Sequence, residues 1–446
     1  MKNNIMRNCL ALTLISGFAL PLRAEEPAPL SLESAIAEAQ AHNPDIARSE
    51  AASREASWRR LEAISGYLPS VGLVAGDVLT TKYTMMGIHF GPQTLEMPAA
   101  APAQTIDIGA SWTFFDGLKT WQIYRAAVAG YEAAKADLVW SRFILERQVK
   151  SRWYRLLASQ MLEGVAKENV LTLESHLDVA KAGMQNGVST QFDILRIEAQ
   201  LEEARADETL TADDVAQARR ALAEILGREG DSIALDGSLP IPDDAIIPPE
   251  SECKIAGRAD LYSLNQRVES AQQAGKAALT SVWCPAISLF ANEDLYKFKA
   301  FNPMIVPDSE FKSAYTVGVR LRWDILSGGA GLAKERQAAA KAEQARQEAK
   351  ARILHASNET VTWRRRYLYN TTLYRARTRS QEKSAESVRI AIAGVKAGVR
   401  TNSEELDAEL DLFRAKAGVF RAQADAADAM LNLEMAIGRS LNTGKR

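Results

Sequence analysis

Four side chains within one short stretch have donor atoms that could bind a soft metal ion. They are Met85, Met86, His89 and Met97. Thioether and imidazole groups suit copper or silver ions. The stretch falls in a predicted loop between two strands. We therefore favour a simpler interpretation, in which these residues fill a flexible loop and bind nothing.

No catalytic constellation stands out elsewhere in the sequence. A Walker motif, a GxSxG nucleophile turn and an HExxH zinc motif are all absent. His42, His176 and His355 have no partner at ligand spacing, and we expect them on helix surfaces. We predict no catalytic residue, no cofactor and no metal site.

Two short stretches share a pattern suited to a helical hairpin. Residues 187–195 read GVSTQFDIL, and residues 398–406 read GVRTNSEEL. Each begins with a glycine that can adopt the left-handed conformation after a helix. Each then has a threonine N-cap, followed three residues later by an acid that can complete a capping box. These residues are Gly187, Thr190 and Asp193 in the first stretch, and Gly398, Thr401 and Glu404 in the second.

The offset of 211 residues between these stretches extends well beyond them. Matched pairs include Trp112 with Trp323, Gly117 with Gly328, Gly183 with Gly394, and Gly227 with Gly438. Upstream, residues 67–79 resemble residues 283–295 at an offset of 216. We infer that the chain contains two copies of one unit.

Very long helices are predicted in both copies. No proline occurs between Pro102 and Pro240 or after Pro307, and both spans are rich in strong helix formers. Residues 118–184 as one helix would be about 100 Å long, which indicates a coiled coil or a helical tube. Apolar residues recur at coiled-coil spacing in the last helix, at Leu406, Leu410, Phe413, Ala417, Phe420, Ala424, Ala427 and Leu431.

The predicted strands have one apolar and one polar face. Residues 104–114 and 314–326 alternate strictly, as is typical of membrane β-strands with lipid outside and water inside. A half-buried strand of a soluble protein is the alternative. On the membrane interpretation, the side chains that line the interior are Asp107, Arg320, Arg322 and Asp324. The aromatic residues at one membrane interface are Tyr67, Trp112, Trp283 and Trp323.

Four strands cannot close a membrane barrel, because the smallest have eight strands. Open edges would also carry unpaired backbone groups into lipid. We therefore expect several copies of the chain to share one barrel.

The N-terminus and the charge balance indicate export and exclude some partners. Residues 1–24 read as a signal peptide, and no cysteine follows them closely enough for a lipid anchor. The formal net charge of −2 gives no reason to expect nucleic acid as a partner. We expect no transmembrane helix in the mature chain. We also expect no disulfide between Cys253 and Cys284, because a long helix separates them.

Taken together, the duplication, order and spacing resemble the TolC-like outer membrane efflux protein family. The resemblance covers residues 31–46, the paired motifs WTFFDG and WDILSG, both turns, and the helix ends AEILG and EMAIG. It implies a mainly α fold with membrane β-strands, in a homotrimeric channel of the Gram-negative outer membrane. Four strands per protomer would form a shared twelve-stranded barrel, and the long helices would form a periplasmic α-barrel.

The same resemblance implies partners and a gate. The partners are a periplasmic adaptor, which contacts the hairpin turns, and an inner-membrane pump of the RND, ABC or MFS class, in efflux or type I secretion. At the closed tip, Arg400 would link to Asp193, and Glu404 and Asp407 would form acidic rings across the aperture. The sequence departs from the family at Val395, where a tyrosine of the latch is expected. Drugs, metals and secreted proteins all stay open as cargo.

Two other functions are alternatives to this channel. A soluble periplasmic coiled-coil adaptor or scaffold protein also has long hairpins, and an exported hydrolase is a more distant option. The predicted division of the chain is a signal peptide (1–24), N-terminal helices (25–66), a first strand pair (67–116), a first helical hairpin (117–228), a linker (229–257), a further helix (258–283), a second strand pair (284–327), a second hairpin (328–439) and a tail (440–446).

Overall fold

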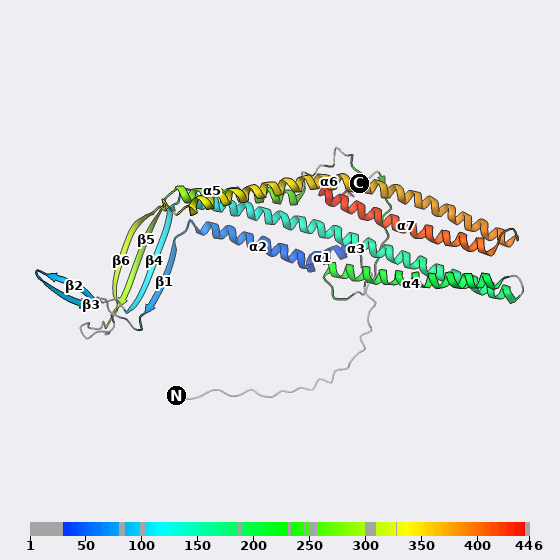
Figure 1. The fold of residues 1–446 in the computed structure, drawn as a ribbon, viewed down its shortest axis with the longest axis horizontal. Helices are drawn as coiled ribbons and strands as arrows, with labels where there is room; N and C mark the ends of the chain where they lie inside the picture. The colour runs from blue at the N-terminus through cyan, green and yellow to red at the C-terminus, as the bar shows by residue number, and fades with distance from the viewer. Residues whose placement is uncertain are drawn as a thin grey trace, which may run out of the picture.

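A long bundle of helices carries a small sheet at one end (Figure 1). This computed structural model describes residues 30–79, 85–98, 103–185, 189–230, 233–244, 247–249, 253, 255, 257–298, 309–326 and 328–441. The predicted signal peptide, Gly187 and most of the tail lie outside the described residues.

Two helices open the described chain, and one residue joins them. Helix α1 spans Leu32–His42 and helix α2 spans Pro44–Ser65. Asn43 between them accepts a hydrogen bond from the Asp45 amide at 2.9 Å, which caps α2. Its side-chain amide also donates to the Ile225 carbonyl at 3.0 Å. Asn43 therefore ends one helix, starts the next and ties both to a helix far along the chain.

The remaining helices form two long hairpins and one shorter helix. Helices α3 and α6 have 67 residues each, and α4 and α7 have 36 each. None of the helices in the described part of the chain has the length and apolar character that crossing a membrane requires. The bounds are Lys119–Gln185 for α3, Gln191–Leu226 for α4, Ala259–Trp283 for α5, Ala330–Lys396 for α6 and Asn402–Ile437 for α7.

The helices pack as pairs along the bundle axis. Helix α3 contacts α2, α4, α5 and α7, and α6 contacts α5 and α7. The largest core cluster joins α1, α3 and α4 around Trp153, which is 1 % exposed. Ile233 and Leu239 from the predicted linker belong to this cluster, so the linker packs into the bundle.

Four strands form one antiparallel sheet in the order β1-β4-β5-β6. Directly paired residues share a face, and one row across the sheet is Leu73, Ile108, Glu293 and Tyr315. Apart from Glu293, this face is mainly apolar, and Tyr315 and Val317 are 80 % and 72 % exposed. The strands span Ser70–Asp77 (β1), Gln104–Phe115 (β4), Ala286–Lys297 (β5) and Lys312–Arg322 (β6).

The segment that we predicted as the first loop contains a second, two-stranded sheet. Strands β2 (Met85–Phe90) and β3 (Gln93–Pro98) pair across the two-residue turn Gly91-Pro92. Gly91 has φ of 61°, as the first central residue of a tight hairpin turn requires. The prediction of a loop was wrong here, because the Gly-Pro signal was overlooked. The side chains of Met85, Met86 and Met97 lie outside what the structure describes.

Candidate functional site: the shared end of the two helical hairpins

Both hairpins turn at the end of the bundle that is remote from the sheet (Figure 1). At the second turn Gly398 has φ of 71°, and the Val399 amide donates to the Gly394 carbonyl at 2.9 Å. Helix α7 then starts at a complete capping box. The Thr401 hydroxyl accepts from the Glu404 amide at 3.3 Å, and the Glu404 carboxylate accepts from the Thr401 amide at 2.8 Å. These predictions for the second turn are confirmed.

The first turn starts α4 in the same way. The Thr190 hydroxyl accepts from the Asp193 amide at 3.2 Å, and the Asp193 carboxylate accepts from the Thr190 amide at 3.0 Å. The predicted capping box is confirmed, whereas Gly187 lies outside the described residues. Hydrogen bonds from Thr190 lower the pKa of Asp193, and those from Thr401 lower the pKa of Glu404. Both acids are therefore charged near neutral pH.

A glycine near the end of the long helix gives each turn room to reverse. A Cβ atom on Gly183 would lie 2.5 Å from the Ser189 hydroxyl oxygen. A Cβ atom on Gly394 would lie 2.8 Å from Cδ of Arg400. The returning chain thus approaches the helix at matched positions in the two copies.

An ion pair joins the two hairpins just inside the turns. The Arg196 guanidinium on α4 donates to the Asp407 carboxylate on α7 at 2.6 Å, and it also contacts the Ser403 hydroxyl. Arg196 and Asp407 occupy matched positions at the offset of 211 residues. We missed this pair in the sequence, although opposite charges at matched positions are a signal that could have revealed it.

The predicted Arg400–Asp193 latch is not formed within this single chain. The Asp193 carboxylate is hydrogen bonded to Thr190, and the Arg400 side chain lies against Gly394. Between these two described residues there is no hydrogen bond or ion pair. The latch stays a prediction for an assembly of several chains. Asp407 pairs with Arg196 within the chain, and the acidic rings of Glu404 and Asp407 likewise stay a prediction for the assembly.

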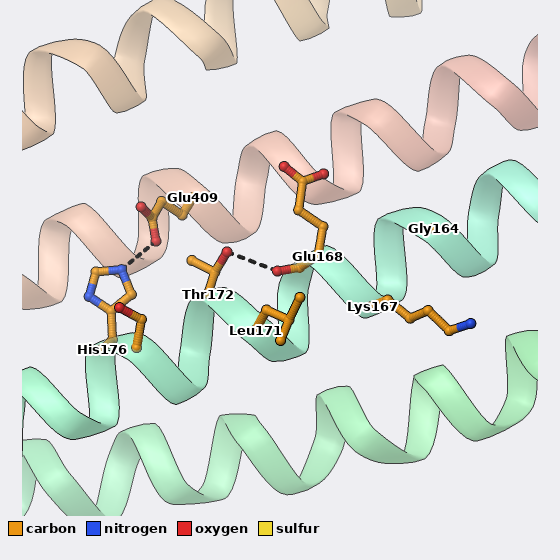
Figure 2. Close-up of a pocket in the computed structure, with 8 residues that line it drawn as sticks. Gly164, Lys167, Glu168, Leu171, Thr172, His176 and Glu409 are labelled. Carbon is orange, nitrogen blue, oxygen red and sulfur yellow. Dashed lines mark hydrogen bonds and ion pairs between the residues drawn. The ribbon is translucent and has the colours of Figure 1, made fainter.

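A cavity of about 270 Å³ lies between the hairpins beside this ion pair. His176 on α3 lines this cavity. Its Nε2 atom is 2.7 Å from Oε2 of Glu409 on α7, and Figure 2, which draws a neighbouring pocket, shows this contact. The hydrogen bond with Glu409 raises the pKa of His176. The sequence shows no partner for His176 at ligand spacing, because Glu409 reaches it from another helix. His355 also has a partner, Glu359, at 3.1 Å.

At the other end of the molecule, the structure gathers the predicted aromatic residues where strands meet helices. Tyr67 lies between α2 and β1, Trp283 ends α5, and Trp323 follows β6. The Trp112 indole on β4 donates to the Tyr67 carbonyl at 2.9 Å. All four aromatic residues therefore lie near the boundary between the sheet and the helical bundle.

The predicted interior charges largely share the face opposite the apolar one. Asp107 pairs with Asp294, and Arg320 pairs with Ser288, both on this polar face. Arg322 is two residues farther along β6, and Asp324 follows the strand, 3.6 Å from Arg322. Cys253 and Cys284 are not joined to each other by a disulfide.

Comparison with known proteins gives matches over most of the chain. The family model described as "Outer membrane efflux protein" matches residues 35–228 and 254–439. Outer membrane protein TolC of Vibrio cholerae serotype O1 is 24 % identical over 410 residues, which are 90 % of this chain and 89 % of TolC. Alkaline protease secretion protein AprF of Pseudomonas aeruginosa is 24 % identical over 313 residues, 67 % of this chain and 62 % of AprF.

A solved structure also has a similar fold. The outer membrane protein VceC from Vibrio cholerae superposes with a TM-score of 0.73 and 17 % identity. The match covers 92 % of this chain and 97 % of VceC.

Proposed function

The chain belongs to the outer membrane efflux protein family, and from this membership we propose that it is the exit duct of an efflux or type I secretion system. It conducts cargo passively from the periplasm to the outside. Its relatives include a protein named for alkaline protease secretion, which supports secretion as well as efflux. Energy would come from an inner-membrane pump, which meets the duct through a periplasmic adaptor.

The observation that carries this proposal is a sheet with two free edges and an exposed apolar face. Among the strands that the structure describes, β1 and β6 each pair with one neighbour only. Unpaired backbone groups at both edges would be costly in lipid. Further copies of the chain would pair those edges, and the resemblance gives three copies and twelve strands. The apolar face with Tyr315 and Val317 would then contact lipid, and Asp107 and Arg320 would line the interior.

We place the gate and the adaptor contact at the shared hairpin end. The helix ends next to both turns lie at the far end of the bundle (Figure 1), and Thr190 and Thr401 are exposed there, so a partner can reach them. The Arg196–Asp407 pair ties α4 to α7, and opening the tip would separate these helices. The predicted Arg400–Asp193 pair would add a further link. The match of the family model to two separate stretches supports the proposed duplication.

The proposal is tested with the purified mature chain, after its predicted signal peptide is removed. We expect a detergent-solubilised complex with the mass of three chains in native mass spectrometry. We also expect ion conductance when this complex is inserted into a planar lipid bilayer. A chain that is monomeric in buffer without detergent would overturn the proposal and would favour the soluble adaptor.

A further inference from the structure

One cluster of side chains at the hairpin end offers potential metal-ligand atoms. These side chains neither cap a helix nor have a role in the proposed conduction. His176 on α3 meets Glu405 and Glu409 on α7, and one ligand atom from each lies within 4.8 Å of the others. The side chains of His176 and Glu409 are 21 % and 16 % exposed. The three residues come from α3 and α7, which belong to different hairpins, and Figure 2 shows His176 and Glu409 side by side.

We propose that His176, Glu405 and Glu409 form a binding site for a divalent transition-metal ion of the zinc class. An imidazole with two carboxylates is a donor set that zinc accepts in proteins, with a fourth position left for water. The imidazole nitrogen disfavours calcium and magnesium, which prefer oxygen ligands. Donor atoms around zinc lie about 3.3 Å apart, given Zn–N and Zn–O distances of ~2.0–2.1 Å. Small side-chain rotations from the present spacing reach that arrangement.

The charge of the cluster also favours a bound cation. Glu405 and Glu409 are one turn apart on α7, and like charges at this spacing repel each other. Of the three basic side chains that line the cavities beside His176, Lys167 pairs with Glu163 and Arg196 pairs with Asp407. The third, Lys396, lines the same cavity as Glu405 and leaves the second carboxylate of the cluster to be offset. A divalent ion would offset both carboxylates and would link α3 directly to α7.

The other copy of the repeat supplies a natural control. At the offset of 211 residues, Ser387 corresponds to His176, Ile194 to Glu405, and Glu198 to Glu409. Glu198 instead lies 3.7 Å from Lys181. The ligand set is therefore specific to the contact between α3 and α7 and does not follow from the fold alone.

The test measures Zn²⁺ binding by calorimetry on the full mature protein in detergent, after removal of bound metals with a chelator. At about pH 8, where protons compete less with the metal for the imidazole, we expect one Zn²⁺ per chain. His176→Ala and Glu409→Gln should each weaken binding at least ~10-fold. The matched control Glu198→Gln should bind as the wild type does. Cobalt added instead of zinc should give the absorption spectrum of a tetrahedral site.

Two results would overturn the site. One is an absence of Zn²⁺ binding by the wild type, which would leave His176 and Glu409 as a simple ion pair. The other is equal binding by wild type and His176→Ala. Glu405→Gln, which leaves the His176–Glu409 hydrogen bond in place, keeps the test decisive if the other variants fail to fold. None of these readouts depends on conduction, so the proposed function can fail or hold separately.

Discussion

At the scale of single residues, one ion pair links the two hairpins near their turns, and its two members occupy matched positions in the two copies. Arg196 and Asp407 occupy the same place in their hairpins but carry opposite charges, 2.6 Å apart. A symmetric repeat would have placed like charges against each other. The change of charge in one copy turns that repulsion into a link between α4 and α7.

Loss of this link should favour the open tip. The Arg196 and Asp407 side chains are 34 % and 55 % exposed, so we assign the pair only about 0.5 kcal/mol. Three copies would give about 1.5 kcal/mol, which is roughly tenfold in the open-to-closed ratio. We expect Arg196→Ala to raise the open probability in planar bilayers by that order, and the double charge reversal to restore it.

A matched control is Arg205→Ala, which breaks an exposed pair with Glu174 inside the first hairpin. It should leave the open probability unchanged. If Arg400→Ala or Asp193→Ala opens the channel and Arg196→Ala does not, the prediction for Arg196 is wrong. The tip is then held closed by the Arg400–Asp193 pair that the family resemblance implies.

A second prediction at this scale concerns acid. Burial raises the pKa of Asp260. The hydrogen bonds and the charge of Arg258 together lower it by more than burial raises it, so the pKa of Asp260 lies below its ordinary value of 3.8. The unfolded chain therefore binds this proton first as the pH falls. The stabilisation from the pair is complete above about pH 4 and is lost as the pH falls through the folded value.

Unfolding by urea, followed by circular dichroism from about pH 6 to pH 3, measures this loss. Asp260→Asn should flatten the acid dependence and lower the free energy of unfolding at neutral pH by ~3 kcal/mol, because Arg258 stays buried. Asp411→Asn removes a carboxylate that is 71 % exposed and 3.9 Å from Arg414, and it should change stability by less than ~0.5 kcal/mol. Equal effects of the two variants would contradict this account.

At the scale of elements, glycines end the helices for two different reasons. Gly398 has φ of 71° and open space around it, so only backbone conformation requires glycine there. Gly438 has φ of 81°, and a Cβ atom would lie 2.6 Å from Cγ of Arg258 and 3.2 Å from its Cα atom. Arg258 itself donates to the Ala436 carbonyl at 2.9 Å at the end of α7. Gly438 therefore serves both the turn and the packing of a buried arginine.

These two reasons can be separated by substitution. Gly398→Ala should cost about 1 kcal/mol through the left-handed backbone alone. Gly438→Ala should cost roughly 2–4 kcal/mol, since a steric clash adds to the same backbone term. Urea unfolding midpoints measure both values. Similar costs for the two variants would mean that Arg258 moves aside without penalty.

At the scale of the whole molecule, the free edges of the sheet are expected to meet those of neighbouring copies. In a closed ring, β1 of one chain would lie beside β6 of the next. Cysteine at Gly72 in β1, combined in turn with cysteine at Thr316, Gly318 or Arg320 in β6, should produce cross-linked species. These should reach three times the mass of the chain and no more.

Cys253 and Cys284 would first be replaced by serine, and the products would be resolved by denaturing electrophoresis. Gly109 in β4 is the control, since β4 pairs with β1 and β5 on its two sides. A cysteine there should form no cross-link to β6 of another chain. A series that stops at two chains would refute the trimer.

Local patterns in the sequence were sufficient to predict the helices, the capping boxes and the alternating strands. Thr190 with Asp193 and Thr401 with Glu404 interact within one turn, so their contacts follow from spacing alone. The Gly91-Pro92 hairpin was equally local and could have been predicted. The left-handed glycines and the matched positions of the two copies likewise need no tertiary information.

Only the tertiary structure decided which side chains meet across helices. His176 lies about eight heptads into α3, and an ideal helix drifts by ~20° per heptad from a 3.5-residue repeat, or roughly 160° in all. That drift is enough to turn His176 from one face of the bundle to the opposite one. Its contact with Glu409, and that of Arg196 with Asp407, therefore depend on how the long helices bend and pack.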